Sequence, residues 1–227
     1  LVEKGITDCF AVVGGGAMHL DNALALNDNI TKYFNHHEQA CAMAAEAYAR
    51  LSGEMAAVCV TSGPGATNTL TGVMGAWQDS LPMIVLSGQV RYEISVPKSG
   101  LQLRYRGIQE FEIIPSVKNM TKYAVMITDP LSIKREMYKA IYIAMEGRRG
   151  PVWIDIPQDM QNAVVEVEDL YPADEEIAQY PKVDYANLCT LLEGAKRPCI
   201  LAGSGIRSGN VMREFTEFVD RMGIPVI

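Results

Sequence analysis

The sequence predicts an α/β fold: a doubly wound, mainly parallel six-stranded sheet with helices on both faces, followed by the beginning of a second α/β domain. Short β-branched or apolar runs alternate with helical patterns through residue 156, which is typical of a parallel sheet covered by helices. Six such runs are enough for a complete doubly wound domain. The pattern fades after Pro157 and restarts near Asn187, so a second domain begins there.

The elements of the first domain follow from this alternation. Strands are expected at residues 9–13, 31–35, 56–60, 83–87, 122–127 and 151–156. Helices are expected between them, at residues 17–26, 38–52, 64–78, 109–118 and 130–146. The last helix is entered through Asp129 and Pro130, an N-cap followed by proline in the first turn.

The domain boundaries are expected at residues 160 and 185. Residues 1–160 form the first domain, and residues 161–184 read as an acidic, exposed linker. Residues 185–227 are the truncated start of the second domain, with strands at 199–203 and 224–227 and a helix at 212–222. Because the chain begins without Met and stops inside an expected strand, we expect a fragment of a longer protein.

Composition excludes several classes of protein. Lys and Arg number 20 against 27 Asp and Glu and are scattered, so no nucleic-acid partner is expected. No apolar run approaches the roughly 20 residues that cross a bilayer, so no membrane association is expected. The five cysteines are odd in number and form no CxxC pair, which favours reduced, buried thiols in a cytoplasmic protein.

Three glycine-rich turns follow expected strands, at residues 14–16, 62–65 and 203–205. In doubly wound sheets the loops at the carboxyl ends of strands line the ligand crevice, and glycine lets the backbone approach a ligand closely. A tight chain reversal explains any single turn equally well. Neither GxGxxG nor a P-loop is present, so a dinucleotide or P-loop site is not supported.

The turn in TSGPGATN, residues 61–68, predicts the wall of a polar pocket. Pro64 is expected at the first helical position, which leaves backbone N–H groups directed into the crevice. Thr61 and Asn68 can add side-chain hydrogen bonds from either side of that position.

Glu38 follows the strand 31–35 directly and begins an alanine-rich helix. An acidic residue there is favoured by the helix dipole alone, yet it also lies at the crevice edge of the sheet. The alanines predict close packing of another helix or of a partner chain. A metal site at His36 and His37 is not expected, because neighbouring residues at a strand end point in opposite directions and only His19 could join them.

Three long motifs occur in order: HHEQACAMAAEAYARLSG, then TSGPGATNTLTGVMGAWQDSLPMIVLSGQV, then GPVWIDIPQDMQ. Together they resemble the N-terminal, pyrimidine-binding domain of thiamine-diphosphate enzymes of the acetolactate synthase type, over residues 5–160. RPCILAGSGI and the residues after it resemble the start of the central domain of that family.

The resemblance implies a role for each matching residue. Glu38 matches the glutamate that hydrogen-bonds a ring nitrogen of the cofactor's aminopyrimidine and promotes its imino tautomer. Gln109 matches a glutamine near the reacting centre, so Glu38 and Gln109 are the expected catalytic residues. The remaining matches line the cofactor pocket: Val13, Gly14, Thr61, Pro64 and Asn68.

The implied activity is the condensation of two 2-keto acids with loss of CO2, a transferase or lyase reaction of branched-chain amino acid biosynthesis. Thiamine diphosphate is the expected cofactor, and the central domain of such enzymes can bind FAD. The family anchors Mg2+ and the diphosphate through a GDG...N motif in a C-terminal domain, and this sequence contains no GDG. The site is shared between chains, so a homodimer or tetramer is expected and the fragment alone should be inactive.

Some residues depart from the family pattern. Val13 stands where acetolactate synthases typically have Pro, and Ile108 stands where they have Phe. The segment 90–111 is longer and more basic than expected and forms either a lid or anion-recognition loop or a surface loop; its basic residues are Arg91, Lys98, Arg104 and Arg106.

Two alternatives therefore stay open. One is a related enzyme that decarboxylates another 2-keto acid and ends in protonation or in transfer to a different acceptor. The other, suggested by GSGIRSG, is a non-catalytic flavin- or nucleotide-binding module.

Overall fold

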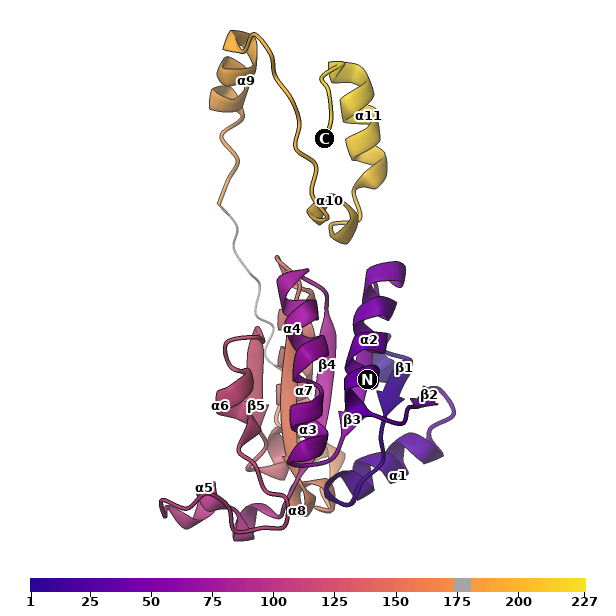
Figure 1. Ribbon diagram of the computed structural model, residues 1–227, viewed down its shortest axis with the longest axis vertical. Coiled ribbons are helices and arrows are strands. Elements are labelled where there is room, and N and C mark those ends of the chain that lie inside the picture. The colour runs from indigo at the N-terminus through magenta and orange to yellow at the C-terminus, as the bar shows by residue number, and fades with distance from the viewer. Residues whose placement is uncertain (174–180) are drawn as a thin grey trace. The chain divides into compact units, whose positions relative to one another are not determined.

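The computed structural model describes residues 1–173 and 181–227. The chain divides into two compact units, Leu1–Glu175 and Glu176–Ile227, and all strands of the sheet belong to the first (Figure 1). No helix in these described residues is both long and apolar enough to cross a membrane.

The first unit is built on one six-stranded sheet, as predicted, and all its strands are parallel; their order is β2-β1-β3-β4-β6-β5. In β3, β4 and β6 every residue is buried, because both faces of the central strands are covered. The strands are β1 (Asp8–Ala11), β2 (Thr31–Phe34), β3 (Ala56–Val60), β4 (Met83–Gln89), β5 (Tyr123–Met126) and β6 (Pro151–Pro157).

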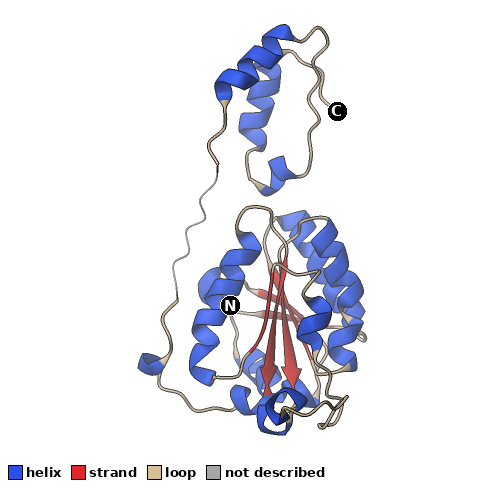
Figure 2. Cartoon of the chain, turned by 90° about the vertical axis from the view of Figure 1, so that its left-hand side faces the viewer, coloured by secondary structure: helices blue, strands red, loops and turns tan. Residues whose placement is uncertain are grey.

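Helices cover both faces of this sheet and enclose two apolar cores (Figure 2). Helices α1 (Met18–Leu26) and α7 (Ile133–Met145) pack over one face, where β4 contributes Ile84. The opposite core contains Val85 of the same strand, as the alternation of side chains along a strand requires. The helices that contribute to that second core are α2 (Glu38–Ser52), α3 (Pro64–Asn68), α4 (Leu70–Gln78) and α6 (Ile113–Val117).

The alanines of α2 predict close packing of another helix or of a partner chain. In the structure α2 packs closely against another helix, α4. A Cβ atom at Gly72 of α4 would lie 2.6 Å from the Cβ of Ala42. The buried face of α2 consists of Cys41, Ala42, Ala45 and Ala49.

Two expected helices are shorter in the structure. The segment 64–78 is interrupted at Thr69, which separates α3 (Pro64–Asn68) from α4. The Thr69 hydroxyl is buried and donates to the Ala66 carbonyl at 2.7 Å, a local bond that competes with the helix pattern. The helix expected at 109–118 begins only at Ile113, because Gln109 has a left-handed backbone with φ of 59°.

Short elements connect the long ones. Asp129 caps the turn before α7 as predicted, since its Oδ1 accepts from the Leu131 amide at 3.0 Å. The short elements are η1 (Val2–Lys4), η2 (Gly15–Ala17), η3 (Tyr92–Ile94), α5 (Val96–Ser99), η4 (Pro130–Ser132), α8 (Gln158–Gln161) and η5 (Val167–Asp169).

The first part of the predicted linker, through residue 173, belongs to the first unit and packs against it. The Tyr171 hydroxyl donates to Asp129 Oδ2 at 2.7 Å, and the guanidinium of Arg135 lies over its ring. Residues 174–180 of that predicted linker lie outside the described residues.

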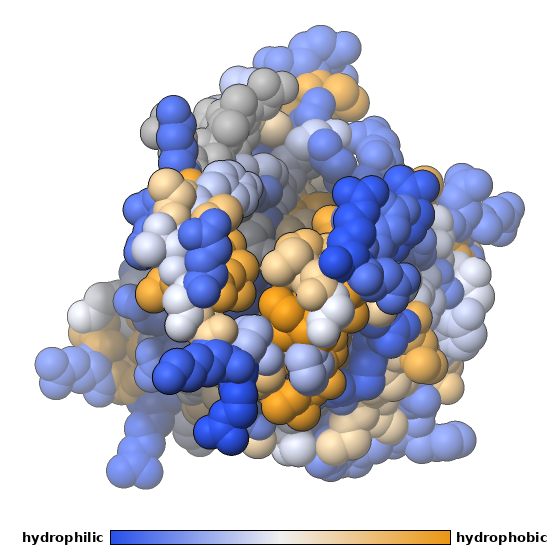
Figure 3. All heavy atoms as spheres, turned by 90° about the horizontal axis from the view of Figure 1, so that it is seen from above, coloured by the Kyte–Doolittle hydropathy of each residue, from blue (hydrophilic) through white to orange (hydrophobic). Residues whose placement is uncertain are grey.

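The second unit contains α9 (Tyr185–Gly194), α10 (Gly205–Ser208) and α11 (Met212–Met222). The strands expected at 199–203 and 224–227 are present only as one parallel bridge between Ile200 and Val226. Its three helices have no buried residue, so apolar side chains such as Phe218 are exposed. Figure 3 shows the molecule from above, where apolar residues lie between strongly hydrophilic ones on the surface.

All five cysteines are free thiols, but only three are buried. Burial raises the pKa of Cys9 to about 12 and raises that of Cys59, so neither is a reactive thiolate near neutral pH. The expectation of burial is wrong for Cys189 and Cys199, which are exposed because the second unit encloses no core around them.

Candidate active site

The loops that follow β1, β3 and β6 converge at the carboxyl ends of the sheet. The Gly16 amide donates to Thr61 Oγ1 at 2.9 Å, which joins the first two loops. Gln158, directly after β6, donates through Nε2 to the Gly15 carbonyl at 2.6 Å. A Cβ atom at Gly88 of β4 would lie 2.1 Å from the Gly16 carbonyl oxygen. The two glycine turns therefore form one crevice, as the topology predicts.

Glu38 and Asn68 meet at this crevice. Glu38 is the first residue of α2, which begins there because His37 Nδ1 accepts from the Gln39 amide at 3.1 Å and caps the helix. Asn68 Nδ2 donates to Glu38 Oε2 at 2.9 Å. No donor within the described residues reaches the second oxygen, Oε1. The half-buried carboxylate is thus oriented by one partner and has one acceptor oxygen free.

The glycines around Thr61 leave no room for side chains. A Cβ atom at Gly14 would lie 2.6 Å from Thr61 Cβ, and one at Gly65 would lie 2.7 Å from Thr61 Cγ2. The same atom at Gly65 would lie 3.6 Å from Glu38 Oε1. The free carboxylate oxygen therefore borders the bare backbone of the second glycine turn.

Pro64 occupies the first position of α3, as predicted, after Gly63 with φ of 60°. The expectation that the backbone amides of this turn point into the crevice is wrong for two of them. The Gly65 amide donates to the Ser62 carbonyl at 3.3 Å, and the Thr67 amide donates to the Gly63 carbonyl at 2.9 Å. These two amides therefore form hydrogen bonds with carbonyl groups of the turn itself.

Gln109 joins the crevice through its backbone. A Cβ atom at Gly63 would lie 2.2 Å from the Gln109 carbonyl oxygen, so the two segments touch. The side chain of Gln109 is exposed, as are Val13 at 59% and Ile108 at 90%. The structure therefore places these residues on the open side of the crevice.

A cavity of about 420 Å³ opens beside Gln109. Ser62 and Gly16 of the glycine turns line it, together with Arg91 of the basic segment. Lys98 of that segment instead pairs with Glu93, with Nζ 3.6 Å from the carboxylate. Of these two basic residues, only Arg91 lines the cavity.

A buried polar network beneath the crevice was not predicted. Asp155 of β6 accepts from the Ser87 hydroxyl at 2.6 Å and from Gln89 Nε2 at 3.1 Å. Trp153 Nε1 donates to Ser87 Oγ at 2.8 Å. Burial raises the pKa of Asp155 to about 7, although the two hydrogen bonds it accepts oppose this rise. The available signal was a lone carboxylate in the apolar run PVWIDI.

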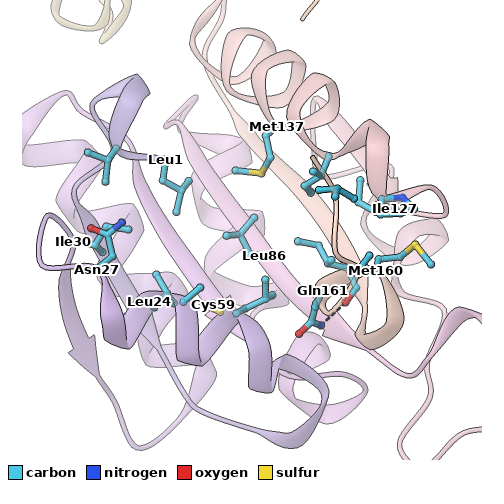
Figure 4. A pocket seen from close by; sticks show the side chains of 18 of the residues that line it. Leu1, Leu24, Asn27, Ile30, Cys59, Leu86, Ile127, Met137, Met160 and Gln161 are labelled. Carbon is cyan, nitrogen blue, oxygen red and sulfur yellow. Dashed lines mark hydrogen bonds between the residues drawn. The ribbon is translucent and has the colours of Figure 1, made fainter. Parts of the chain in front are cut away.

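A larger cavity, of about 600 Å³, lies on the sheet face covered by α1 and α7 (Figure 4). Leu24, Leu86 and Met137 line it, and none of the predicted site residues does. The described ranges, 1–173 and 181–227, hold no group of three or more His, Cys, Asp or Glu residues placed to bind a metal ion.

The comparisons with known proteins identify the family. Residues 1–110 match the family model described as "Thiamine pyrophosphate enzyme, N-terminal TPP binding domain", and residues 185–227 match the model of the central domain. The chain belongs to the thiamine pyrophosphate enzyme family. The N-terminal match contains all the predicted site residues, from Val13 to Gln109.

Several curated relatives are acetolactate synthases. The chain is 34% identical over 233 residues to the acetolactate synthase large subunit of Lactococcus lactis subsp. lactis and 30% identical over 233 residues to the isozyme 3 large subunit of Escherichia coli. It is 34% identical over 233 residues to acetolactate synthase 1, chloroplastic, of Oryza sativa subsp. japonica. The alignments cover all of this chain but 39% of each bacterial protein and 34% of the rice protein.

Proposed function

We propose that this chain is part of an acetolactate synthase-like enzyme that condenses two 2-keto acids with loss of CO2. The observation that carries the proposal is the pairing of Glu38 with Asn68 beside a crevice of bare glycine backbone. The names of the relatives support the substrate class.

The crevice residues fit thiamine diphosphate. Glu38 Oε1 has no partner in the described part of the chain, so it can accept a hydrogen bond from a ring nitrogen. Gly14 and Gly65 leave the wall without side chains where a flat ring must approach. We propose that the residues holding the cofactor are Val13, Gly14, Glu38, Thr61, Pro64, Asn68 and Gln109.

Each of these groups has a separate task in the proposal. Thiamine diphosphate, when bound, supplies the electron sink that lets a 2-keto acid lose CO2. Glu38 holds and moves a proton at Oε1, while Asn68 fixes the carboxylate by its bond to Oε2. Thr61 keeps the two glycine turns in register through its bond from Gly16. Gln109 faces the bound substrate from the open side.

The rest of the enzyme is proposed from the family. Mg2+ and the diphosphate would be held by a C-terminal domain of a second subunit, which makes a homodimer or tetramer necessary. FAD would bind the central domain, whose beginning is residues 185–227. The three buried free thiols, Cys9, Cys41 and Cys59, support a reducing compartment such as the cytoplasm.

The test is Glu38→Gln in the full-length enzyme. Because the amide cannot take up a proton, we expect turnover of pyruvate to fall by at least about 100-fold while the melting temperature is retained. Glu46→Gln, the same change on the same helix, is the matched control and should keep normal turnover. Near-normal turnover of Glu38→Gln would overturn the proposal.

Product analysis distinguishes the proposed reaction from those of related decarboxylases and transferases. Incubation of the full-length enzyme with pyruvate should yield acetolactate. Release of CO2 without acetolactate would assign the chain to a decarboxylase or to a transferase that uses another acceptor.

A further inference from the structure

The Gln109 loop, residues 107–111, is held from below by the end of β4. Gln89 is 2% exposed, and its Nε2 donates to the Phe111 carbonyl at 2.8 Å. Its Oε1 accepts from the Val90 amide at 3.0 Å. Val90 in turn touches the loop, since a Cβ atom at Gly107 would lie 2.6 Å from Val90 Cγ1. Gln89 therefore supports both ends of the loop.

Asp155 determines which way the Gln89 amide faces. An amide group has two N–H donors and one carbonyl acceptor, and turning it over would exchange them. Here one N–H is directed to Asp155 Oδ2 and the other to Phe111, and the carbonyl is directed to Val90. Because Asp155 offers only acceptors when ionised, the turned-over amide would place two acceptors against each other.

The loop needs such support because its backbone is strained. Gln109 has φ of 59°, in the left-handed region that non-glycine residues seldom occupy. Its carbonyl presses against Gly63 of the glycine turn. A second anchor, Glu110, accepts from the Gly107 amide at 2.9 Å and the Arg106 amide at 2.7 Å, but it lies on the partly exposed side. Of the two side chains that hydrogen-bond this loop within residues 1–173 and 181–227, Gln89 is the buried one.

We propose that Asp155 is a positioning residue that acts through Gln89 on the Gln109 loop and so determines where Gln109 meets the substrate. The catalytic part of this inference rests on the proposed function. Asp155 is wholly buried and touches neither Gln109 nor Glu38 through any hydrogen bond found in the described residues. Its effect on the reaction must therefore pass through the loop.

The first measurement needs no substrate or cofactor. Hydrogen–deuterium exchange of the loop amides is compared in the wild-type chain, Asp155→Leu and Asp155→Asn. We expect faster exchange over residues 107–111 in Asp155→Leu, which removes the acceptor. Asp155→Asn keeps one carbonyl oxygen for Gln89, while Ser87 can either donate or accept, so it should retain the wild-type exchange. Unchanged exchange in Asp155→Leu would overturn the proposal.

The second measurement is a double-mutant cycle in the full-length enzyme. Asp155→Leu, Gln89→Met and Gln109→Ala should each lower kcat/KM for the keto acid by about 10- to 100-fold, as small misplacements do. Adding Asp155→Leu to Gln109→Ala should cost less than about threefold more, because both changes act at one place. Fully multiplicative losses would show an independent structural effect and would overturn the proposal.

Two control variants distinguish an effect on the loop from a general loss of stability. Val152→Ala, at a buried position of the same strand outside the network, should lower the melting temperature without changing the cycle. Gln89→Met breaks the loop contact even if Asp155→Leu does not fold. A normal rate in Gln109→Ala alone would remove Gln109 from the proposed function and overturn the catalytic part of the inference, while loop exchange still decides whether Asp155 holds the loop.

Discussion

At the scale of single residues, two glycines with positive φ differ in ψ and in what surrounds them. Gly53 has φ of 77° and ψ of 1°, the left-handed helical conformation, whereas Gly63 has φ of 60° and ψ of −117° and lies outside it. A Cβ atom at Gly53 meets nothing within 4 Å, whereas one at Gly63 lies 2.2 Å from the Gln109 carbonyl oxygen. Alanine at Gly53 therefore meets only a left-handed backbone, whereas alanine at Gly63 meets a conformation further from those open to it and a steric overlap as well.

Gly53→Ala should lower the free energy of unfolding by about 1 kcal/mol, the cost of left-handed backbone in alanine. Gly63→Ala should cost about 2 kcal/mol more, because its ψ of −117° disfavours alanine and the Gln109 loop must move away as well. Urea unfolding of the two variants measures the difference. Equal losses would contradict both the backbone strain and the steric overlap at Gly63.

Asp155 predicts a pH dependence of stability. Its folded-state pKa is raised to about 7, above the value of about 3.9 in an unfolded chain. Between these values the folded chain keeps a proton that the unfolded chain has released. The free energy of unfolding therefore falls as pH rises through this window, and the contribution is intact near pH 4 and lost above pH 7.

Asp155→Asn cannot titrate, so its unfolding free energy should lack this fall. Urea titrations of wild type and variant at several pH values from about 4 to 8 provide the check. We expect the difference between the two curves to change steadily across the window. Parallel curves would show that Asp155 titrates in the folded chain as it does in water.

At the scale of secondary-structure elements, the contact between α2 and α4 depends on Gly72. A methyl group there would lie 2.6 Å from Ala42 Cβ and 2.8 Å from the Met43 nitrogen, whereas one at Gly75 meets only Glu46 at 3.8 Å. Gly72→Ala should therefore lower the unfolding free energy by about 1 to 3 kcal/mol through overpacking. Gly75→Ala should raise it by up to about 1 kcal/mol, since alanine favours the helix. Thermal melting compares the two, and a stabilising Gly72→Ala would contradict the packing.

The elements that the sequence predicts correctly are those with a strong local signal. Apolar runs identify all six strands, and Asp129 caps the turn before α7 as predicted, whereas the cap at His37 was not predicted. The break at Thr69 and the late start of α6 depend on one hydroxyl bond and one left-handed residue, neither of which leaves a pattern. The expected strands of the second unit form only one bridge, because a strand needs neighbours to pair with.

In the candidate site, too, residues with a local sequence signal could be predicted, whereas contacts between distant segments could not. Thr61 could be identified because it directly follows β3, and Glu38 because it begins the helix that comes shortly after β2. Their contacts could not: the bond between Asn68 and Glu38 joins residues 30 positions apart. Asp155 was overlooked because its partners lie on β4, 66 to 68 residues away.

At the scale of the whole molecule, the two units differ in how much they bury. Every residue of β3, β4 and β6 is buried, whereas α9, α10 and α11 contain no buried residue. Amides that open only on global unfolding should therefore be found in those strands. In hydrogen–deuterium exchange of the whole chain we expect the strands to exchange slowest and α9 and α11 to exchange orders of magnitude faster. Comparable protection in the two units would contradict this.

The strand order also bears on how the protein is made. β6 lies between β4 and β5, so β4 lacks one neighbour and β5 lacks its only neighbour until residues 151–157 have been synthesised. No two strands adjacent in the sheet are joined by a hairpin, because every pair is parallel. A nascent chain whose residues 151–157 have not yet emerged from the ribosome therefore exposes an apolar strand edge along β4, and it depends on slow, long-range pairing to cover it. Pausing of translation shortly before β6 emerges would prolong that exposure and favour aggregation or capture by chaperones.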